Sequence, residues 1–420
     1  MEDITNQYTF KSYIFFWSGQ LFSLLGSLVV QFVIIFWITI ETGSAMILVL
    51  ANFFYIFPAM ILTPIAGVYA DRLNKKYLIL IVDSLQAYFT LILTIFFLFN
   101  VTNIWIIFTT IGLRSVFQAF HAPAVNAIVP IMVPKEKLSR INGITYLFTG
   151  FIQLIGPGLA ATLLAFFSTK YILWIDLITF FIALVPLLII KIPSLQTNIE
   201  QLKKNSFFKD FKQGFKEIKK IHGLLILMPV VMLINFLLQP LFVLLPLYIT
   251  DIHSGGALEI AIIEMIVQGG MISGAIISSI KKQWKNKILN MFIGVLIANI
   301  GYAFFALSPV GFYLLMWMGG FLLGFIIPIV NTIFMTIMQT SIPKEKYGRT
   351  SSIISTFSMV IMPLGVILSW PLSELFGIAG LFLYCALVGA FITLGAYFFT
   401  DIRFVSFDQD LNITTPQSTD

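Results

Sequence analysis

Apolar residues along this chain come in long blocks that are separated by short polar connections. Twelve of these blocks have about the 20 residues that a helix needs to cross the hydrocarbon core of a bilayer. We therefore predict membrane-spanning helices at 13–38, 44–70, 77–99, 104–130, 141–167, 170–190, 223–250, 257–280, 288–307, 311–339, 351–371 and 377–400.

The composition agrees with this pattern and excludes a soluble globular domain. Hydrophobic residues make up 59% of the chain and charged residues 10%, whereas soluble domains carry about a quarter charged residues. So little charge cannot cover a surface that faces water. The one cysteine, Cys385, excludes a disulfide framework and a cysteine metal cluster, and we expect neither a metal nor another cofactor.

The positions of the basic residues orient the predicted spans. Of the 25 Lys and Arg, only Lys170 falls in a predicted external loop and only Arg114 within a span. The other 23 lie in predicted cytoplasmic segments if the N-terminus faces the cytosol, as the positive-inside rule requires. The acidic start lacks the basic region of a cleaved signal. We expect a multi-pass protein of the cell membrane with both termini in the cytosol, and the formal net charge of +6 needs no nucleic-acid partner.

One long polar stretch divides the predicted spans into two sets of six. Residues 192–222 place Phe208, Phe211 and Phe215 at helical spacing with lysines between them, which predicts a basic amphipathic linker on the inner leaflet. This linker separates an N-terminal half, 1–191, from a C-terminal half, 223–402. The tail, 403–420, is polar, and we expect it to be disordered.

Two short segments of the first half recur in the second. The sequence Pro-Lys-Glu-Lys at 134–137 returns at 343–346, an offset of 209 (343 − 134), between the fourth and fifth predicted spans of each half. Just upstream, Pro-Ala-Val-Asn at 123–126 parallels Pro-Ile-Val-Asn at 328–331. Six plus six helices related by an internal repeat are a transporter architecture, in which the halves move about a site near the middle of the membrane.

Polar side chains inside the apolar blocks form stripes on spans 1, 4, 7 and 10. Arg114, in the middle of span 4, needs a polar partner or a wet cavity, because a central Arg costs roughly 2.5–3.5 kcal/mol on insertion scales. Arg114 therefore has one of two roles. It serves the substrate cavity or proton coupling, or it forms a structural ion pair within the first half. The stripes contain Gln20, Ser27, Gln31, Arg114, Gln118, Asn235, Gln239 and Asn331.

Three carboxylates lie within predicted spans: Asp83, Asp176 and Glu264. A carboxyl group in low dielectric favours its neutral form and can carry a proton. Glu264, in span 8 before a run of small residues, is the preferred proton site. Asp176 is a second candidate, with a helix-packing hydrogen bond as its alternative role. His121 in the span 4 stripe is either a proton shuttle or a simple hydrogen-bonding residue.

The connection between spans 2 and 3, residues 67–76, resembles the motif G-x-x-x-D-R-x-G-R-K of the major facilitator superfamily. Asn74 replaces the second Gly and also tolerates the left-handed turn conformation. The resemblance implies an all-α integral membrane fold, with twelve transmembrane helices in two pseudo-symmetric six-helix halves. It also implies that spans 1, 4, 7 and 10, where the polar stripes fall, line the substrate cavity. A cytoplasmic gate is implied at Gly67, Asp71, Arg72, Lys75, Lys76, Asp83, Arg140 and Arg349.

Further segments resemble the drug-exporting branch of this superfamily, which includes macrolide efflux proteins and the enterobactin exporter. Gly150 and Gly156-Pro157-Gly158 in span 5 partly match the Gly-Pro motif of its antiporters, which lets helices of the two halves pack closely. Trp17-Ser18-Gly19-Gln20 and residues 120–127 carry the rest. The resemblance implies export of amphipathic, macrolide-like drugs by proton antiport through alternating access, with Glu264, Arg114 and Asp176 in proton coupling.

Other functions remain as alternatives. A specific exporter or importer of a siderophore, nutrient or metabolite is one, and a non-transporting membrane scaffold or sensor is another. An intact Asp71-Arg72 latch argues against the scaffold, which has no need of a gate. We expect no enzyme, because the chain has no phosphate-binding loop and no nucleophile or zinc motif. The expected partners are a small-molecule substrate, protons and the lipid bilayer, around a monomer.

Overall fold

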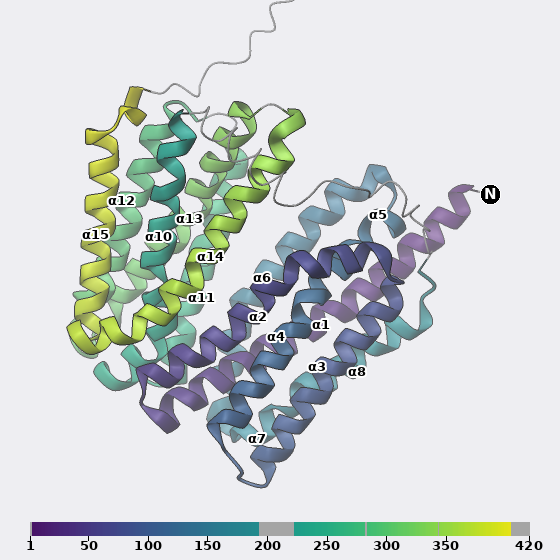
Figure 1. The fold of residues 1–420 in the computed structure, drawn as a ribbon. Coiled ribbons are helices and arrows are strands. Elements are labelled where there is room, and N and C mark those ends of the chain that lie inside the picture. The colour runs from purple at the N-terminus through teal and green to yellow at the C-terminus, as the bar shows by residue number, and fades with distance from the viewer. Residues whose placement is uncertain (1, 193–221, 282–283, 343, 405–420) are drawn as a thin grey trace, which may run out of the picture.

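A computed structural model describes residues 2–192, 222–281, 284–342 and 344–404, apart from the side chains of 2–9, 68, 70–72, 135, 139, 222, 344–349, 352, 355, 356 and 359. The regular elements of this part are helices (Figure 1). The first half contains α1 (Glu2–Thr42), α2 (Ala45–Arg72), α3 (Lys75–Leu98), α4 (Ile104–Asn126), α5 (Val129–Met132), η1 (Lys135–Lys137), α6 (Leu138–Phe166), α7 (Thr169–Ile172) and α8 (Trp174–Ile189). The second half contains α10 (His222–Leu247), the π-helical η3 (Tyr248–Ile252), α11 (Ala257–Ile280), α12 (Lys287–Ala306), α13 (Tyr313–Ser341), α14 (Lys344–Phe376), α15 (Ile378–Phe399) and η4 (Asp401–Phe404).

Each predicted span corresponds to helical structure. Eleven helices of the described chain are long and apolar enough to cross a membrane. The twelfth, α14, has 33 residues, but its apolar part is the shorter stretch Val360–Phe376. The predicted all-α integral membrane fold is therefore confirmed. The sixth span differs in detail, because its helix is divided at Leu173 into α7 and α8. Most of the predicted linker, 192–222, and of the predicted tail, 403–420, lies outside the described residues.

Polar side chains cap the starts of three spanning helices. Ser44 accepts a hydrogen bond from the backbone N–H of Ile47 at the start of α2, and Asn103 accepts one from Trp105 at the start of α4. Asn74 accepts hydrogen bonds from the N–H groups of Lys76 and Tyr77. Its φ is −64°, so this position does not use the left-handed conformation that asparagine tolerates. Asn74 serves instead as the N-cap of α3, which satisfies N–H groups that have no partner within the helix.

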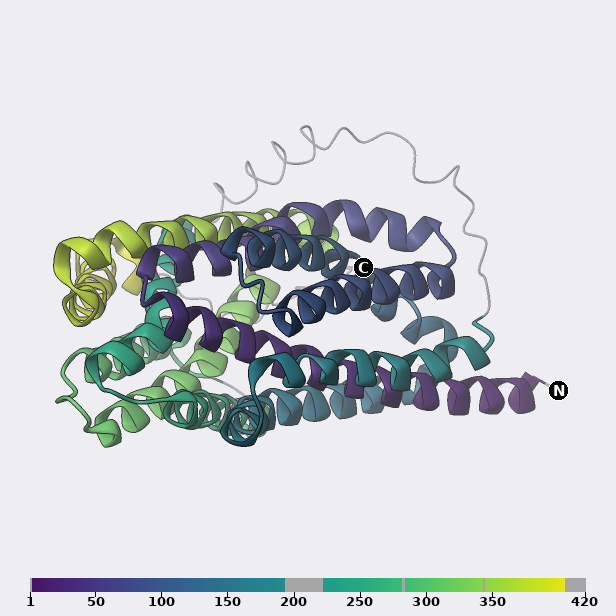
Figure 2. The same cartoon turned by 90° about the horizontal axis from the view of Figure 1, so that it is seen from below.

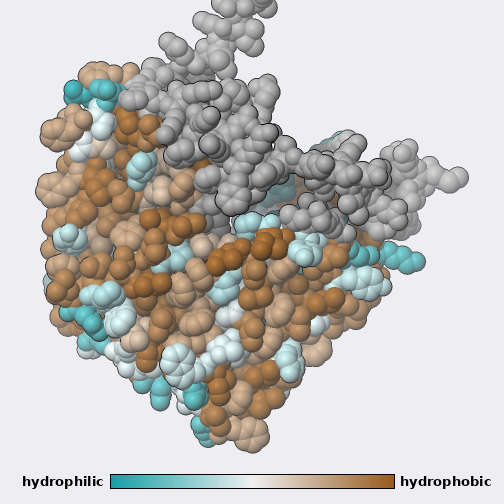
Figure 3. All heavy atoms as spheres, in the orientation of Figure 1, coloured by the Kyte–Doolittle hydropathy of each residue, from teal (hydrophilic) through white to brown (hydrophobic). Residues whose placement is uncertain are grey.

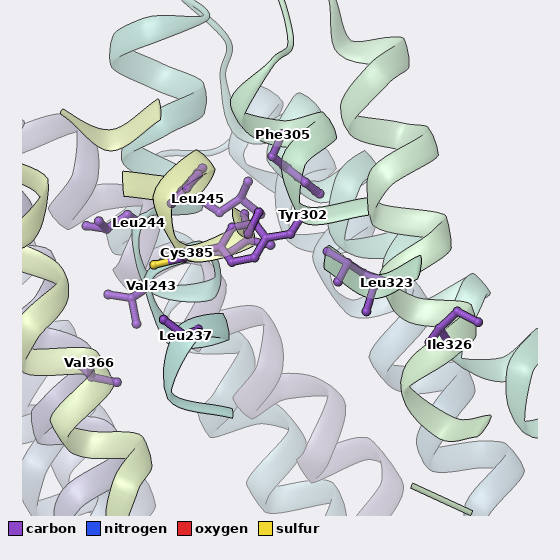
Figure 4. Packing of buried hydrophobic residues seen from close by; sticks show 14 of the residues in the cluster. Leu237, Val243, Leu244, Leu245, Tyr302, Phe305, Leu323, Ile326, Val366 and Cys385 are labelled. Atoms are coloured by element: carbon purple, nitrogen blue, oxygen red, sulfur yellow. The ribbon is translucent and has the colours of Figure 1, made fainter. Parts of the chain in front are cut away.

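The second half has a continuous apolar core. Leu237, Leu244 and Leu245 from α10 belong to one apolar cluster with Tyr302 and Phe305 from α12 and Cys385 from α15 (Figure 4). Tyr302 and Phe305 are each 1% exposed. The lone cysteine is thus a buried core residue.

Among the described side chains, the apolar clusters that join the two halves lie toward one end of the molecule. At the end where α1 turns into α2, Ile38 and Leu48 share an apolar cluster with Leu247 of α10. At the opposite end, the cluster around Tyr13 and Ile190 contains only first-half residues among those described. The contacts between the halves run through α6 with α11 and α2 with α14. In Figure 1 the two halves accordingly converge toward the α1–α2 turn and diverge away from it.

Within the first half, α1 packs against α8 and α6. Figure 2 shows this helix running beside α8. Gly26 permits the close approach, since a Cβ built there would lie 2.0 Å from the Thr179 hydroxyl oxygen. The outer surface of the molecule is dominated by apolar side chains (Figure 3), and aromatic residues such as Phe399 are almost fully exposed. Such a surface fits a lipid environment rather than water.

Candidate functional site

Three cavities bring the polar side chains of the spans together. The α2 cavity, about 300 Å³, is lined by α1, α2, α3 and α4 and is touched by Met362 of α14. The first-half cavity, about 390 Å³, is lined by residues of α1, α2, α3, α4, α5, α6 and α8. The interface cavity, about 390 Å³, is lined by helices of both halves. Gln31 on α1 lines all three, which makes it the meeting point of the polar interior.

An ion pair joins α4 to α8 between the first two cavities. Arg114 Nη2 lies 3.0 Å from Asp176 Oδ2. The carboxylate also accepts hydrogen bonds from Ser27 Oγ at 2.8 Å and Thr90 Oγ1 at 2.7 Å. Three donors from three further helices therefore surround one buried anion, which is the arrangement that a charge needs in low dielectric. Arg114 is ion-paired within the first half and also lines the α2 cavity, so its position is compatible with both expected roles.

A second polar cluster joins α1, α3 and α4 in the first-half cavity. His121 Nε2 lies 3.3 Å from Asp83 Oδ1 and 2.9 Å from Gln20 Oε1. Gln20 Nε2 in turn donates to Asp83 Oδ2 at 3.4 Å. Asp83 is 7% exposed. Asp83, which we expected in the cytoplasmic gate, contacts Gln20 of α1 and His121 of α4, and the side chains of Asp71 and Arg72 lie outside the described residues.

Glu264 of α11 lies in the interface cavity. Carboxamide side chains line the same cavity: Gln31, Asn52, Gln153 and Gln268. Pro157 of α6 and apolar residues of α1 and α10 complete it. No hydrogen bond or ion pair reaches the Glu264 carboxylate from the part of the chain that the structure describes. It is thus an acid without a counter-charge, at the boundary between the two halves.

The predicted cavity residues divide between the halves. Gln20, Ser27, Gln31, Arg114 and Gln118 line one or more of the three cavities. The second-half residues do not line any of them. The amides of Asn235 and Gln239 bond to the backbone of their own helix α10, and Gln239 also packs against Gly365. Asn331 is exposed on α13. The polar interior of this conformation is therefore built mainly by the first half.

The structure describes only part of the predicted gate. The side chains of Asp71, Arg72 and Arg349 lie outside the described residues, and Arg140 is exposed. Lys76 Nζ donates to the backbone carbonyls of Leu188 and Ile190, at 2.8 and 2.6 Å. A cation at the end of a helix stabilises its free carbonyl groups, so Lys76 holds the end of α8 in this conformation. Near Gly67, no described atom lies within 4 Å of an added Cβ.

The Gly-Pro segment of α6 lies at the contact between the halves. A Cβ built at Gly158 would be 2.8 Å from Met265 Sδ of α11, and one at Gly150 would be 3.9 Å from Ile272 Cγ1. Gly156 faces Leu28 of α1 instead, while Pro157 lines the interface cavity. Gly158 therefore brings α6 close to α11, whereas an added methyl group at Gly150 would make only an ordinary contact.

Sequence reasoning missed several residues of the site. Thr90 and Gln86 on α3 take part in the Asp176 cluster and the cavity walls. Asp83, Gln86 and Thr90 follow the spacing i, i+3, i+7, so the stripe argument used for spans 1 and 4 would have found them. Ser115 was hidden for another reason: its hydroxyl donates to the Tyr55 carbonyl of α2, a contact that no pattern within one helix reveals.

Comparisons with known proteins agree with this architecture. The sequence profile described as Major Facilitator Superfamily matches residues 16–366. Macrolide efflux protein A of Streptococcus pyogenes is 28% identical over 90% of this chain and 93% of its own. Multidrug efflux pump Tap of Mycolicibacterium fortuitum is 22% identical over 87% of this chain and 90% of its own.

A solved structure shows the same fold. A bacterial homologue of the human lysosomal transporter Spinster, in an inward-facing and unoccupied conformation, superposes with a TM-score of 0.70. It is 14% identical and covers 97% of this chain and 99% of its own. The helical fold, the cavities between spans and the profile match over residues 16–366 together show that this multi-pass membrane protein belongs to the Major Facilitator Superfamily.

Proposed function

We propose that this protein exports amphipathic, macrolide-like drugs across the cell membrane by proton antiport through alternating access. Its similarity to macrolide efflux protein A extends over nine-tenths of the chain, and the multidrug pump Tap matches over a comparable length. The cavities of about 300 to 390 Å³ have the size and the mostly apolar lining that small-molecule sites have. Uphill export requires a source of free energy, which in this proposal is the proton gradient.

The observation that carries the proton-coupling proposal is the environment of Glu264. A carboxylate in an apolar cavity is stable only if it is paired or neutral. No described cation lies beside Glu264, so the protonated form is favoured whenever the cavity is closed to water. Because the cavity is lined by α1 and α6 of one half and α10 and α11 of the other, opening it to either side would expose the acid to that solution. This is the property that a proton carrier requires.

The other two carboxylates within the spans are less suited to this task. Asp176 is held by Arg114, which stays charged at all relevant pH values. We therefore propose that Asp176 positions Arg114 in the cavity wall rather than carrying the transported proton. Asp83 faces His121, which can itself take up a proton.

The separation of the two halves at one end of the molecule supports alternating access. If the positive-inside rule orients the chain, the apolar contact around Ile38 and Leu247 closes the external side. The end with Tyr13 and Ile190, where the halves share no apolar cluster, then faces the cytosol. Drugs would enter the cavities from there, and a rocking of the halves would release them outside.

Transport by cells or vesicles tests this function. Cells that express the protein should accumulate less of a fluorescent macrolide than control cells, and an uncoupler that collapses the proton gradient should abolish the difference. In Glu264→Gln we expect proton-driven efflux to fall about 100-fold or more, while binding of the drug persists, because glutamine keeps the shape but cannot release a proton.

Glu259→Gln on the same helix is the matched control. Its carboxylate caps the Gly256 N–H at 2.7 Å, a bond that glutamine can also accept, so its transport should equal that of the wild type. Efflux that survives collapse of the proton gradient would contradict proton antiport, and wild-type efflux by Glu264→Gln would contradict the role of this residue. A panel of chemically unrelated drugs separates a multidrug exporter from a transporter specific for one siderophore or metabolite.

A further inference from the structure

The middle of α2 contains several features that weaken a helix. Pro58 and Pro64 both lie inside it, and each removes the backbone donor that would serve the carbonyl four residues earlier. Thr63 Oγ1 donates to the Ala59 carbonyl at 2.7 Å, a contact that often bends helices. Figure 1 shows α2 changing direction along its course. The sequence of α2 therefore favours a bend in this part of the helix.

A hydroxyl group from α4 contacts the backbone of α2 at the same place. Ser115 Oγ accepts a hydrogen bond from the Ala59 N–H at 3.1 Å and donates one to the Tyr55 carbonyl at 2.6 Å. In a regular α-helix these two backbone groups, four residues apart, bond to each other. Ser115 thus bridges a donor and an acceptor of the helical ladder, and a side chain in this position is a known cause of helix kinks.

The bridge gives α2 two arrangements with the same number of hydrogen bonds. In the bent helix, Ser115 serves both backbone groups. In a straight helix, the Ala59 N–H would donate directly to the Tyr55 carbonyl. The Ser115 hydroxyl would then donate to the Ile111 carbonyl of its own helix, as Thr110 donates to Ile106 at 2.8 Å. Because backbone groups inside a membrane must be satisfied within the protein, this exchange lets α2 change its bend at little cost.

The bridged step lies where α2 meets the other half. Tyr55, Ala59 and Ser115 all line the α2 cavity, and Met362 of α14 lines the same cavity. The helices α2 and α14 are also in contact. Beyond Ala59, α2 continues to its end at Arg72, before the connection to α3. A change of bend at Ala59 would therefore alter the contact with α14 and displace this end of α2.

We infer that the step from Tyr55 to Ala59 is a hinge in α2 and that Ser115 is the positioning residue that holds it bent in the present conformation. This inference rests on alternating access in the proposed function and assigns a residue to it. When the halves close at the end that is open here, α2 straightens. The hydrogen bond between Ala59 and Tyr55 then forms directly, and the Ser115 hydroxyl turns to its own helix.

Distances between spin labels in the purified protein test the hinge. In a Cys385→Ala background, labels at Tyr69→Cys and Leu188→Cys lie on opposite sides of the hinge, on exposed positions of α2 and α8. Ser115→Ala cannot form the bridge, so the straight helix is favoured. We expect the distance between these labels to change by about 5 Å, because a kink of about 20° acts over about 15 Å of helix.

A second pair of labels shows whether the change starts at the hinge. Met46→Cys, an exposed position of α2 before the hinge, is combined with the same Leu188→Cys. The distance between these two labels should be equal in Ser115→Ala and in the protein that keeps Ser115. A change of both distances by the same amount would mean that α2 moves as a rigid helix, which would overturn the hinge.

Three further variants separate the bridge from a general effect on packing. Thr110→Val is the matched control, because the Thr110 hydroxyl is 3% exposed on the same helix but bonds only to Ile106, and its distances should equal those of the wild type. Ser115→Thr keeps the hydroxyl and should also preserve them. Pro58→Ala restores a backbone donor and favours a straight α2. It should change the distance between positions 69 and 188 in the same direction as Ser115→Ala, and it provides the test if Ser115→Ala does not fold.

Transport shows whether the hinge is used. Ser115→Ala and Pro58→Ala should lower the maximal rate of efflux at least about threefold at equal amounts of folded protein, because the return to the bent conformation becomes slower. Ser115→Thr and Thr110→Val should transport as the wild type does. Unchanged label distances in both Ser115→Ala and Pro58→Ala would overturn the hinge. If the distances change as expected but cells show no uncoupler-sensitive efflux, the proposed export is wrong while the hinge stands.

Discussion

The buried ion pair of Arg114 and Asp176 makes a sharp prediction at the scale of single residues. Asp176→Asn should destabilise the protein by about 3–5 kcal/mol, because it leaves a guanidinium without its counter-charge in the membrane interior. Arg114→Gln should cost a similar amount. Thermal unfolding in detergent provides the measurement.

The double variant Arg114→Gln/Asp176→Asn distinguishes pairing from other effects. We expect it to be more stable than either single variant, since no charge then lacks a partner. Thr109→Val is the control on α4, because the Thr109 hydroxyl is exposed and bonds only to its own helix. If the stability losses of the two single variants simply add in the double variant, Arg114 and Asp176 are not energetically coupled.

His253, between η3 and α11, predicts a pH dependence of stability. It is 3% exposed, its Nδ1 accepts a hydrogen bond from the Gly311 N–H at 3.1 Å, and its ring lies against Tyr248. Burial lowers the pKa of this imidazole below its ordinary value of about 6.5. The unfolded chain then binds a proton more readily than the folded one, so the stability that depends on neutral His253 is present above about pH 6.5 and is lost as the pH falls below it.

Melting temperatures measured from pH 8 to pH 5 test this expectation. His253→Gln retains an acceptor for Gly311 but has no charge to gain, so its stability should decline less between pH 7 and pH 5 than that of the wild type. An identical decline in the two proteins would show that other groups cause it.

At the scale of helices, the packing of α11 on α13 depends on the glycines that follow Glu264. A Cβ at Gly270 would lie 2.6 Å from the Phe321 carbonyl oxygen, and one at Gly274 would be 2.0 Å from the Phe325 carbonyl oxygen. Because the obstacles are backbone atoms, the helices must separate. We expect Gly270→Ala to cost about 1–3 kcal/mol and Gly274→Ala at least as much.

The neighbouring glycine offers a control within one helical turn. No described atom lies within 4 Å of a Cβ added at Gly269, so Gly269→Ala should be neutral or slightly stabilising, as alanine favours the helix. Thermal unfolding and expression level of the three variants give the comparison. Equal effects at 269 and 270 would mean that helix propensity, not packing, decides the outcome.

The helices themselves could be predicted from the sequence far better than their contacts. An apolar block of 20 residues must be a helix in lipid, whatever surrounds it, so the spans were confirmed. The division of the sixth span at Leu173 depends on local packing and had no such signature. Stripes identified polar faces on α1 and α4, but Asn235 and Gln239 follow the same spacing and bond to their own helix. Periodicity shows which residues share a face, not what that face contacts.

At the scale of the whole molecule, the repeat and the charge bias predicted two halves but not their relation. Nothing in the sequence distinguishes the conformation that is open at one end from its alternative, since both use the same helices. The placement of Asp83 illustrates the limit: its position near the end of span 3 suggested the gate, and only the packing of α3 against α1 and α4 brings it to Gln20 and His121.

The contact between α6 and α11 predicts how the open end closes. Gly158 faces Met265 and Gly150 faces Ile272. The two helices are therefore antiparallel, and a lower residue number on α6 faces a higher residue number on α11. Continued by one turn, this register brings Tyr146 to Ile276, which are 85% and 49% exposed in the present conformation. We expect these two side chains to meet when the halves close at this end, because closure would remove both apolar surfaces from water.

Cysteine cross-linking can detect this contact. In a Cys385→Ala background, Tyr146→Cys with Ile276→Cys should form a disulfide only in molecules that have closed this end, and the cross-link should block transport. Tyr146→Cys with Ile293→Cys, an exposed position on α12, is the control pair and should not cross-link. If the 146–276 pair cross-links no faster than the control while the protein transports, closure does not follow the α6–α11 register. A cross-link that forms and is reversed by reductant, with transport restored, would identify this helix pair as the part of the interface that opens and closes.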